Sequence, residues 1–394
     1  MKLRWFFSAT FRQATDLCHH VRKLLNAQRD ILSPQALAAL QTALRDTRAA
    51  MDSGAGAADL RKQMESLEKT ATKWIKPYPN AEWRDNVEVF LVAIVVAMGI
   101  RTFFLQPFKI PTGSMQPTLY GVTIKDCRGD PNFKMPGFLG RTYELLVHGR
   151  IYHQFIASQD GQVVRVGPVD HSLHIVNRQT FWVQYAGGGP EVPITLWCGP
   201  DDPATQARWL EPPWFFHKGD PILCFKETTG DHLFVDRLTY NFRHPRRGEI
   251  IVFKTRGIER LASFIGDKDQ FYIKRLIGLP GDSVSIGDDR HARINGLRLD
   301  AGTPHFANVY GFDPKKEPGE SQYSGHVLAG DPRALLRSPD DSIPVPPKSY
   351  LVFGDNTVNS LDSRYWGALS EQNVIGTSFF VYWPITSRFG WGQQ

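Results

Sequence analysis

The strongest constraint on this chain is an apolar segment at residues 87–105, VEVFLVAIVVAMGIRTFFL. It holds an uninterrupted apolar run of 12 residues, Val89 to Ile100, a length also found in buried core helices. As a 19-residue helix the segment would be about 28 Å long, close to the roughly 30 Å hydrocarbon core of a bilayer. Its two charged residues, Glu88 and Arg101, lie near the ends, where a bilayer tolerates them. We predict one transmembrane helix, with a core helix as the alternative.

Residues 1–86 carry 14 Lys/Arg against 9 Asp/Glu, so about +5 of the net charge of +6 lies there. No nucleic-acid-binding signature accompanies this charge, and a basic stretch before an apolar segment is typical of the cytoplasmic flank of a membrane anchor. Lys73, Lys76 and Arg84 therefore predict an N-terminus inside the cell and the remaining chain outside. The partner implied is a phospholipid bilayer rather than nucleic acid.

The texture of the chain changes after the apolar segment. Before it, Ser33 and Pro34 form a helix start signal, and the pattern predicts a helical hairpin. The first 13 residues suit either an interfacial helix or an ordinary soluble helix. After it, short β-like runs such as EIIVF and QFYIKRLIGL alternate with Gly, Pro and Asp clusters, which predicts a mainly β body. Four cysteines without C-x-x-C spacing allow one disulfide, for which Cys127 and Cys198 are the candidates.

Several reaction classes are excluded by missing motifs. G-x-S-x-G, H-E-x-x-H and Walker A patterns are absent, and Pro117 stands where an S-x-x-K motif from Ser114 would need lysine. Ser114, in PTGSMQPTL, is an ordinary turn residue unless a base from elsewhere activates it. Lys274, in the apolar strand YIKRLIGLPGD, is a candidate base if burial lowers its pKa from about 10.4. The alternative is a surface lysine on an edge strand.

Three separated segments, FKIPTGSMQPTL, YIKRLIGLPGD and GDNTVNSLDSRYWG, closely resemble the nucleophile, base and orienting motifs of bacterial type I signal (leader) peptidases. HLFVDRLTYNFRHPRRGEIIVF and FFVYWPITSRFGWG resemble further family segments in the same order. The resemblance implies a β-rich catalytic body outside the cytoplasm. Together with the segments described above, the expected fold is mainly β: a signal-peptidase-like antiparallel β catalytic body with one N-terminal transmembrane helix and a helical cytoplasmic extension, which is longer than the family pattern requires. The resemblance also implies a membrane-bound serine endopeptidase that removes signal peptides after small residues at P1 and P3, without metal or cofactor.

The resemblance assigns roles residue by residue. Ser114 is the expected nucleophile and Lys274 the general base. The backbone N–H of Ser114 and the hydroxyl of Thr112 are expected to form the oxyanion hole, and Ser360 to orient the lysine amine. The expected structural ion pairs join Arg275 with Asp355 and Asp362 with Arg364. The residues expected to line the substrate pockets are Phe108, Ile110, Pro111, Met115, Leu119, Tyr272 and Ile273.

These motifs divide the chain into expected regions. They are a helical, basic cytoplasmic extension (1–86), a transmembrane helix (87–105), a catalytic β core (106–121, 218–287 and 347–394), a β-rich insertion (122–217) and a variable second subdomain (288–346). The expected location is the bacterial cytoplasmic membrane as a single-pass protein with the catalytic domain outside. The expected partners are signal-peptide-bearing preproteins, the bilayer and the export translocon. Two other functions stay open: a self-cleaving repressor with a Ser-Lys dyad, and a membrane-tethered scaffold without peptidase activity.

Overall fold

The computed structural model describes residues 8–75, 81–130, 132–170, 177–198, 214–266, 269–311 and 325–391. The chain divides into two compact units, Met1–Val95 and Val96–Gln394. The first unit is helical and the second is built mainly from antiparallel strands, so the predicted mainly β body is confirmed.

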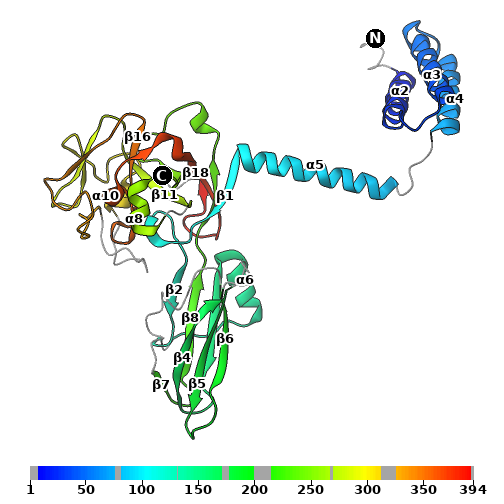
Figure 1. Ribbon diagram of the computed structural model, residues 1–394. Helices are drawn as coiled ribbons and strands as arrows, with labels where there is room; N and C mark the ends of the chain where they lie inside the picture. Colours follow the sequence, from blue (N-terminus) through cyan, green and yellow to red (C-terminus); the bar gives the residue numbers. More distant parts are fainter. Residues whose placement is uncertain are drawn as a thin grey trace. The chain divides into compact units, whose positions relative to one another are not determined.

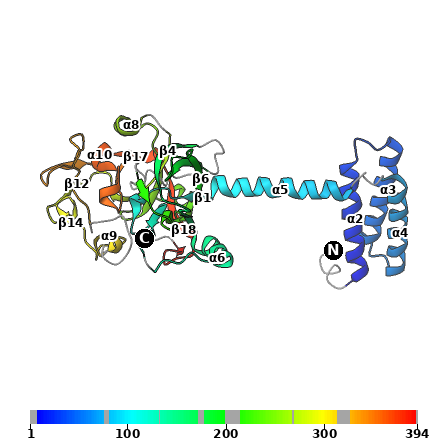
Figure 2. The ribbon, with the colours of Figure 1, turned by 90° about the horizontal axis from the view of Figure 1, so that it is seen from below.

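Three helices make up most of the first unit: α2 (Ala9–Ala27), α3 (Pro34–Asp52) and α4 (Ala57–Trp74). They lie side by side (Figure 2) and bury one apolar face each. The α3 start signal is confirmed, because Ser33 Oγ accepts a hydrogen bond from Ala36 N and Pro34 is the first helical residue. The predicted hairpin is thus a three-helix unit, in which α2 is an ordinary packed helix; residues 1–7 lie outside the described part. The shared core consists of Cys18, Val21, Leu25, Leu40, Leu44 and Leu67.

The apolar segment forms α5 (Ala81–Phe103), which begins six residues before the predicted segment and ends two residues before its end. It stops there because Leu105 already belongs to strand β1. Residues Trp83–Phe103 are long and apolar enough to cross a membrane, and none of that apolar window is buried. It is the one helix of this kind in the described ranges. Because a core helix would be buried, the structure argues against that alternative.

The main sheet of the second unit has eight strands, all antiparallel, in the order β1-β9-β18-β10-β11-β16-β17, with β19 paired to β18. Strands β1, β11, β16 and β18 of this sheet are labelled in Figure 1. Alternation is clear in β9, where Leu233 and Val235 are buried and their neighbours are half exposed. The strand bounds are β1 (Leu105–Lys109), β9 (His232–Asp236), β10 (Ile250–Lys254), β11 (Phe271–Gly278), β16 (Ser349–Phe353), β17 (Leu369–Ser370), β18 (Val374–Trp383) and β19 (Gly390–Trp391). Short helical turns connect them: η1 (Gly113–Met115), η2 (Thr239–Asn241), α8 (Glu259–Ile265), η3 (Thr357–Asn359), α10 (Ser363–Trp366) and η4 (Glu371–Asn373).

The described residues of the predicted insertion (122–217), together with β8 just after it, form two further antiparallel sheets and one helix. The chain leaves the main sheet through β2 (Thr123–Asp126) and returns through β8 (Pro221–Thr228), and these two strands pair with each other. Beyond them lie α6 (Phe138–His148), β3 (Arg150–Ile156), β4 (Gly161–Asp170), β5 (Asn177–Tyr185), β6 (Val192–Cys198) and β7 (Trp214–Phe216). The sheets are β2-β8-β3 and β6-β5-β4-β7, with a common apolar core that includes Val163, Phe181 and Phe225.

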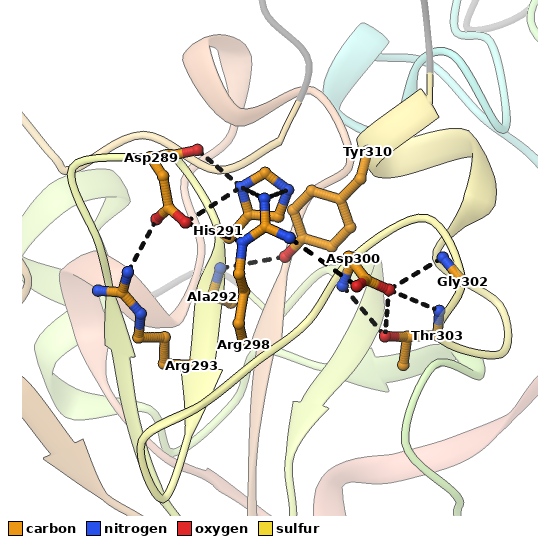
Figure 3. Close-up of polar contacts among 9 residues, drawn as sticks. All are labelled: Asp289, His291, Ala292, Arg293, Arg298, Asp300, Gly302, Thr303 and Tyr310. Atoms are coloured by element: carbon orange, nitrogen blue, oxygen red, sulfur yellow. Dashed lines mark hydrogen bonds and ion pairs between the residues drawn. The ribbon is translucent and has the colours of Figure 1, made fainter.

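A small four-stranded sheet, β14-β13-β12-β15, follows β11 in the region of the expected second subdomain. Its strands are β12 (Ser283–Ile286), β13 (Ala292–Ile294), β14 (Leu297–Arg298) and β15 (Ser342–Pro344), and α9 (Ala307–Gly311) lies beside them. Its surface carries a network of polar contacts (Figure 3), in which Asp289 accepts hydrogen bonds from Arg293 and Arg298 and the ring of His291 stacks on Tyr310 at 4.5 Å. Each exposed ion pair of this kind contributes little to the stability of the fold. We regard the network as a surface contact that holds these loops together, without a catalytic role.

Cys127 is a free, buried thiol, so the suggested pairing with Cys198 is not formed. Cys127 follows β2 directly, and its backbone N–H donates to the carbonyl of Cys224 in β8. Strand register thus places Cys127 opposite Cys224 rather than Cys198. Sequence spacing did not reveal this, because cross-strand neighbours are set by long-range pairing.

Candidate active site

Ser114 lies in the turn η1, and buried apolar side chains pack this turn against the main sheet. Its neighbour Met115 and the nearby Leu119 are completely buried in a cluster with Leu233 and Val235 of β9. The backbone N–H of Leu119 also donates to the carbonyl of Met115. Ser114 itself is only 6% exposed, so a turn that looks polar in sequence is firmly packed.

Asn356 fixes the same turn from the opposite side. Its side-chain Nδ2 donates to the carbonyl of Gly113 at 3.0 Å, and its backbone N–H donates to the carbonyl of Ser114 at 3.1 Å. Gly354 is equally close, since a Cβ at that position would lie 2.5 Å from the carbonyl oxygen of Ser114 and 2.2 Å from Ser360 Oγ. The segment before η3 therefore packs backbone against backbone on the serine turn.

Lys274 comes from the middle of β11, opposite Ile251 of β10. Its side chain is buried, and Nζ lies 2.8 Å from Ser114 Oγ and 3.0 Å from the carbonyl oxygen of Ile273. The ring of Tyr272 lies 5.3 Å from the same nitrogen. The structure thus brings the two predicted catalytic side chains into hydrogen-bonding contact, and Lys274 is not a surface lysine.

Burial lowers the pKa of Lys274 from its ordinary value near 10.5 to about 8. The carboxylates of Asp362 and Asp355 oppose this shift, and the charge of Arg364 adds to it. At neutral pH roughly a tenth of the molecules then carry a neutral amine, which has a free lone pair. A buried lysine of this kind can act as a general base without help from histidine.

Ser360 lies in the same buried region but has a different partner from the one expected. Its hydroxyl donates to Asp362 Oδ2 at 2.7 Å. Among the described residues, the hydrogen-bond partners of Lys274 Nζ are Ser114 and Ile273, and Ser360 is not one of them. The hydroxyl is held by a carboxylate, and its lone pairs stay available as acceptors.

Both expected ion pairs are present and fully buried. Arg275 Nε and Nη2 bind the two carboxylate oxygens of Asp355 at 2.8 and 2.6 Å. Arg364 binds Asp362 in the same two-pronged way at 2.8 and 2.9 Å. Burial raises the pKa of Asp362, but Arg364 and the hydrogen bonds around it lower it more, so it stays below its ordinary value. Because each carboxylate is saturated by donors, removing one partner leaves a costly buried charge.

Thr112 stands immediately before the serine turn. Its hydroxyl Oγ1 lies 3.5 Å from Ser114 Oγ, at the outer limit of a hydrogen bond. The threonine hydroxyl is therefore next to the atom that would become the nucleophile, with room to turn toward a different acceptor.

The residues expected to line substrate pockets divide into two groups. Met115, Leu119 and Ile110 are buried in the core cluster beneath the turn. The others are accessible to a substrate from outside: Pro111 is exposed, and Phe108, Tyr272 and Ile273 are partly exposed. The accessible apolar surface is therefore smaller than the sequence predicted.

Two contributors to the site were missed at the level of sequence. Asn356 clamps the serine turn, and Thr118 binds Asp355 through its hydroxyl at 2.5 Å. Both stand inside the motifs quoted above, so their polar character next to Ser114 and Asp355 was the available signal. No group of three or more His, Cys, Asp or Glu side chains that could bind a metal ion occurs in the part of the chain described.

Comparison with known proteins gives a consistent match. A family model described as signal peptidase, peptidase S26, matches residues 83–125 and 226–383, just over half of the chain. The unmatched stretch between them holds α6 and β3–β7. The chain is 34% identical over 160 residues to a signal peptidase I of Leptolyngbya laminosa, covering 41% of this chain and 63% of that protein.

Two further similarities are to a second curated relative and to a solved structure. A signal peptidase I of Bacillus caldolyticus is 31% identical over 157 residues, 40% of this chain and 72% of that protein. A solved signal peptidase I from Enterococcus faecalis V583 is 30% identical and aligns over 34% of this chain and 97% of its own, with a TM-score of 0.23. The chain spans 56 to 66% of the length of the first curated relatives that it matches.

Proposed function

The chain belongs to the signal peptidase (peptidase S26) family, and we propose that it is a membrane-tethered serine endopeptidase that removes N-terminal signal peptides from exported preproteins. The observation that carries this proposal is the 2.8 Å contact between the buried amine of Lys274 and Ser114 Oγ. A serine hydroxyl is a weak nucleophile until a base within hydrogen-bonding distance takes its proton. Lys274 can supply that base, because its lowered pKa leaves part of the amine neutral near neutral pH.

The reaction follows from these two groups. Neutral Lys274 accepts the proton of Ser114 Oγ as the oxygen attacks the scissile carbonyl carbon. The oxyanion that forms accepts hydrogen bonds from the backbone N–H of Ser114 and from the hydroxyl of Thr112, which turns away from Ser114 Oγ. The Lys274 ammonium then protonates the leaving amine, and a water activated by the same amine hydrolyses the acyl-enzyme.

Ser360 acts through the lysine in this scheme. Its hydroxyl donates to Asp362, so its lone pairs can accept a hydrogen bond from the Lys274 amine once Ser114 has lost its proton. Asp362 fixes the direction of that hydroxyl, and Arg364 holds Asp362 in place. Arg275 and Asp355 hold β11 against the segment before η3 in the same way.

Specificity for small residues at P1 and P3 follows from the apolar surface beside Ser114. The partly exposed Phe108, Tyr272 and Ile273 offer shallow contacts to an extended peptide, while Met115 and Ile110 fill the space beneath. A pocket with a filled floor accepts alanine-sized side chains and excludes larger ones. The preprotein would lie extended and gain affinity from backbone hydrogen bonds.

The membrane tether is α5, whose apolar face is unburied. The basic residues before it, including Lys73 and Arg84, favour an N-terminus on the cytoplasmic side and Ser114 on the outer face. Beyond the preprotein and the bilayer, the export translocon is the partner that this arrangement suits. A catalytic site at the outer surface lies where the hydrophobic part of a signal peptide ends.

The test uses the full chain in detergent or vesicles with a preprotein that carries an Ala-x-Ala cleavage site. Ser114→Ala and Lys274→Ala are each expected to lower cleavage by roughly 10⁴-fold while circular dichroism stays unchanged. Lys254→Ala, an exposed lysine of the neighbouring strand β10, is the matched control and keeps full activity. Normal cleavage by either site variant rejects the mechanism, and an inactive wild-type chain favours the scaffold function.

A further inference from the structure

Helix α6 (Phe138–His148) turns its apolar side chains toward the solvent. None of its 11 residues is buried, although Phe138, Leu139 and Leu146 are large apolar residues with exposed fractions of 75, 81 and 66%. Tyr143 and Leu145 are exposed as well. On a surface helix of a globular protein the apolar stripe faces the core, so α6 has the reverse arrangement.

The side of α6 that faces the protein carries a charge instead. Glu144 binds Arg150 of β3 at 3.0 Å, and both side chains are partly shielded from solvent. At 3.6 residues per turn, Glu144 lies about 150° around the helix axis from Leu139 and Leu146. The apolar face is therefore directed outward by an ion pair on the opposite face.

The orientation of α6 is fixed by specific contacts rather than by loose packing. Trp383 Nε1 donates to the carbonyl of Leu146 at 2.7 Å, and Ile385 N donates to the carbonyl of Val147 at 2.8 Å. Gly149 ends the helix with φ of 61°, and a Cβ there would lie 2.3 Å from Thr229 Cγ2. The chain thus builds an exposed apolar face and holds it rigidly against the end of β18.

Two features indicate which surface this face contacts. Exposed apolar residues continue beyond β18 as Ile385, Phe389 and Trp391, and β18 belongs to the sheet whose first strand, β1, directly follows α5. The charged residues exposed at and just before α6 are basic, Lys134 and Arg141. A helix with Phe and Leu on one face and basic residues at its border matches an interfacial membrane helix, because the basic groups attract anionic headgroups.

We propose that α6 is a second membrane contact, lying in the interface of an anionic phospholipid bilayer with Phe138, Leu139 and Leu146 inserted. This inference rests on the membrane tether of the proposed function and extends it to the inserted module, which the family match does not cover. Together α5 and α6 would hold the second unit at two points. The height and tilt of Ser114 above the bilayer would then be fixed relative to a membrane-bound substrate.

The experiment places the photoreactive residue p-benzoylphenylalanine at Leu139 in the full chain, reconstituted in vesicles of phosphatidylethanolamine and phosphatidylglycerol. The matched control carries it at Leu297 of β14, which is 76% exposed. Mass spectrometry after illumination is expected to find a phospholipid adduct at position 139 at least tenfold more often than at position 297. Equal yields at the two positions, or an adduct at position 139 only with another protein chain, overturn the proposal.

This readout does not depend on peptidase activity, so an inactive enzyme and a helix away from the membrane give different results. Alkaline extraction of the same vesicles reports separately whether α5 anchors the chain. A second measurement compares Leu139→Asp with Leu297→Asp. The first variant is expected to cleave a vesicle-embedded preprotein about tenfold more slowly and a short soluble peptide at the wild-type rate, whereas the second keeps both rates. Equal rates for both variants on the embedded substrate would also overturn the proposal.

Discussion

Lys274 Nζ and Ser114 Oγ are 2.8 Å apart, although 160 residues separate them in the chain. The contact joins β11 in the main sheet to the turn η1, and both side chains are buried. Burial is what makes the pair chemically useful, because it lowers the pKa of the amine into a range where it can accept a proton.

The pH dependence of cleavage should report the amine of Lys274. Only the neutral amine accepts a proton, so kcat/KM is expected to rise with pH, reach half its maximum near pH 8 and level off above it. The measurement is a pH–rate profile on a soluble peptide substrate. A half-maximum near pH 6 or below would point to a different base and contradict the assignment.

Replacing Lys274 by methionine should stabilise the fold at neutral pH while abolishing activity. Folding lowers the pKa of this lysine, so the folded state binds its proton less tightly than the unfolded state does. The buried ammonium therefore destabilises the folded state. This destabilisation is complete below about pH 8 and disappears above the ordinary pKa near 10.5, where the amine is neutral in both states. We expect Lys274→Met to raise the free energy of unfolding by roughly 3 kcal/mol at pH 7, and by much less at pH 11.

Denaturant unfolding at these two pH values measures the effect. Lys254→Met, at an exposed site, serves as the control and should change stability little at either pH. A loss of stability at pH 7 in Lys274→Met would mean that packing around the amine, rather than its charge, dominates.

Asn356→Ala should slow catalysis without unfolding the protein. The side chain of Asn356 donates to the carbonyl of Gly113, and its loss removes one of the two hydrogen bonds by which Asn356 holds the serine turn. A small displacement of Ser114 is expected to lower kcat by about 10- to 100-fold, with little change in KM. Val358→Ala, at an exposed neighbouring position, should keep wild-type kinetics. An unchanged kcat in Asn356→Ala would show that the backbone contact alone suffices.

Cys127 and Cys224 should resist alkylation in the folded protein. Both thiols are buried, and burial raises the pKa of Cys127 and raises that of Cys224 to about 11. The thiolate is the reactive form, so iodoacetamide near pH 8 is expected to label neither residue until denaturant is added. Peptide mass spectrometry before and after denaturation gives the answer. Rapid labelling of the native protein would contradict the burial of this strand pair.

Local chemistry explains why much of the fold was predictable. Ser33 and Pro34 start α3 because a cap and a first-turn proline act within a few residues, and the apolar run of α5 is visible as composition alone. Strand β12 alternates in sequence, as Ser, Val, Ser and Ile, in the same way as it alternates in burial. The predicted helical hairpin was wrong, because α2 packs against α3 and α4 as a third helix. This packing, through Phe11 and Cys18, depends on partners far along the chain.

The sequence by itself determined which residue types are candidates for the chemistry: a serine in a short turn, a lysine in an apolar strand, and paired Arg and Asp residues. Only the tertiary structure decided that Lys274 is buried against Ser114, that Ser360 donates to Asp362, and that Cys127 faces Cys224 rather than Cys198. It also decided that Met115 and Leu119 serve the core, and that α6 points its apolar face outward. The physical reason is that burial, pKa and hydrogen-bond partners depend on strand register and packing between distant segments, which no local pattern encodes.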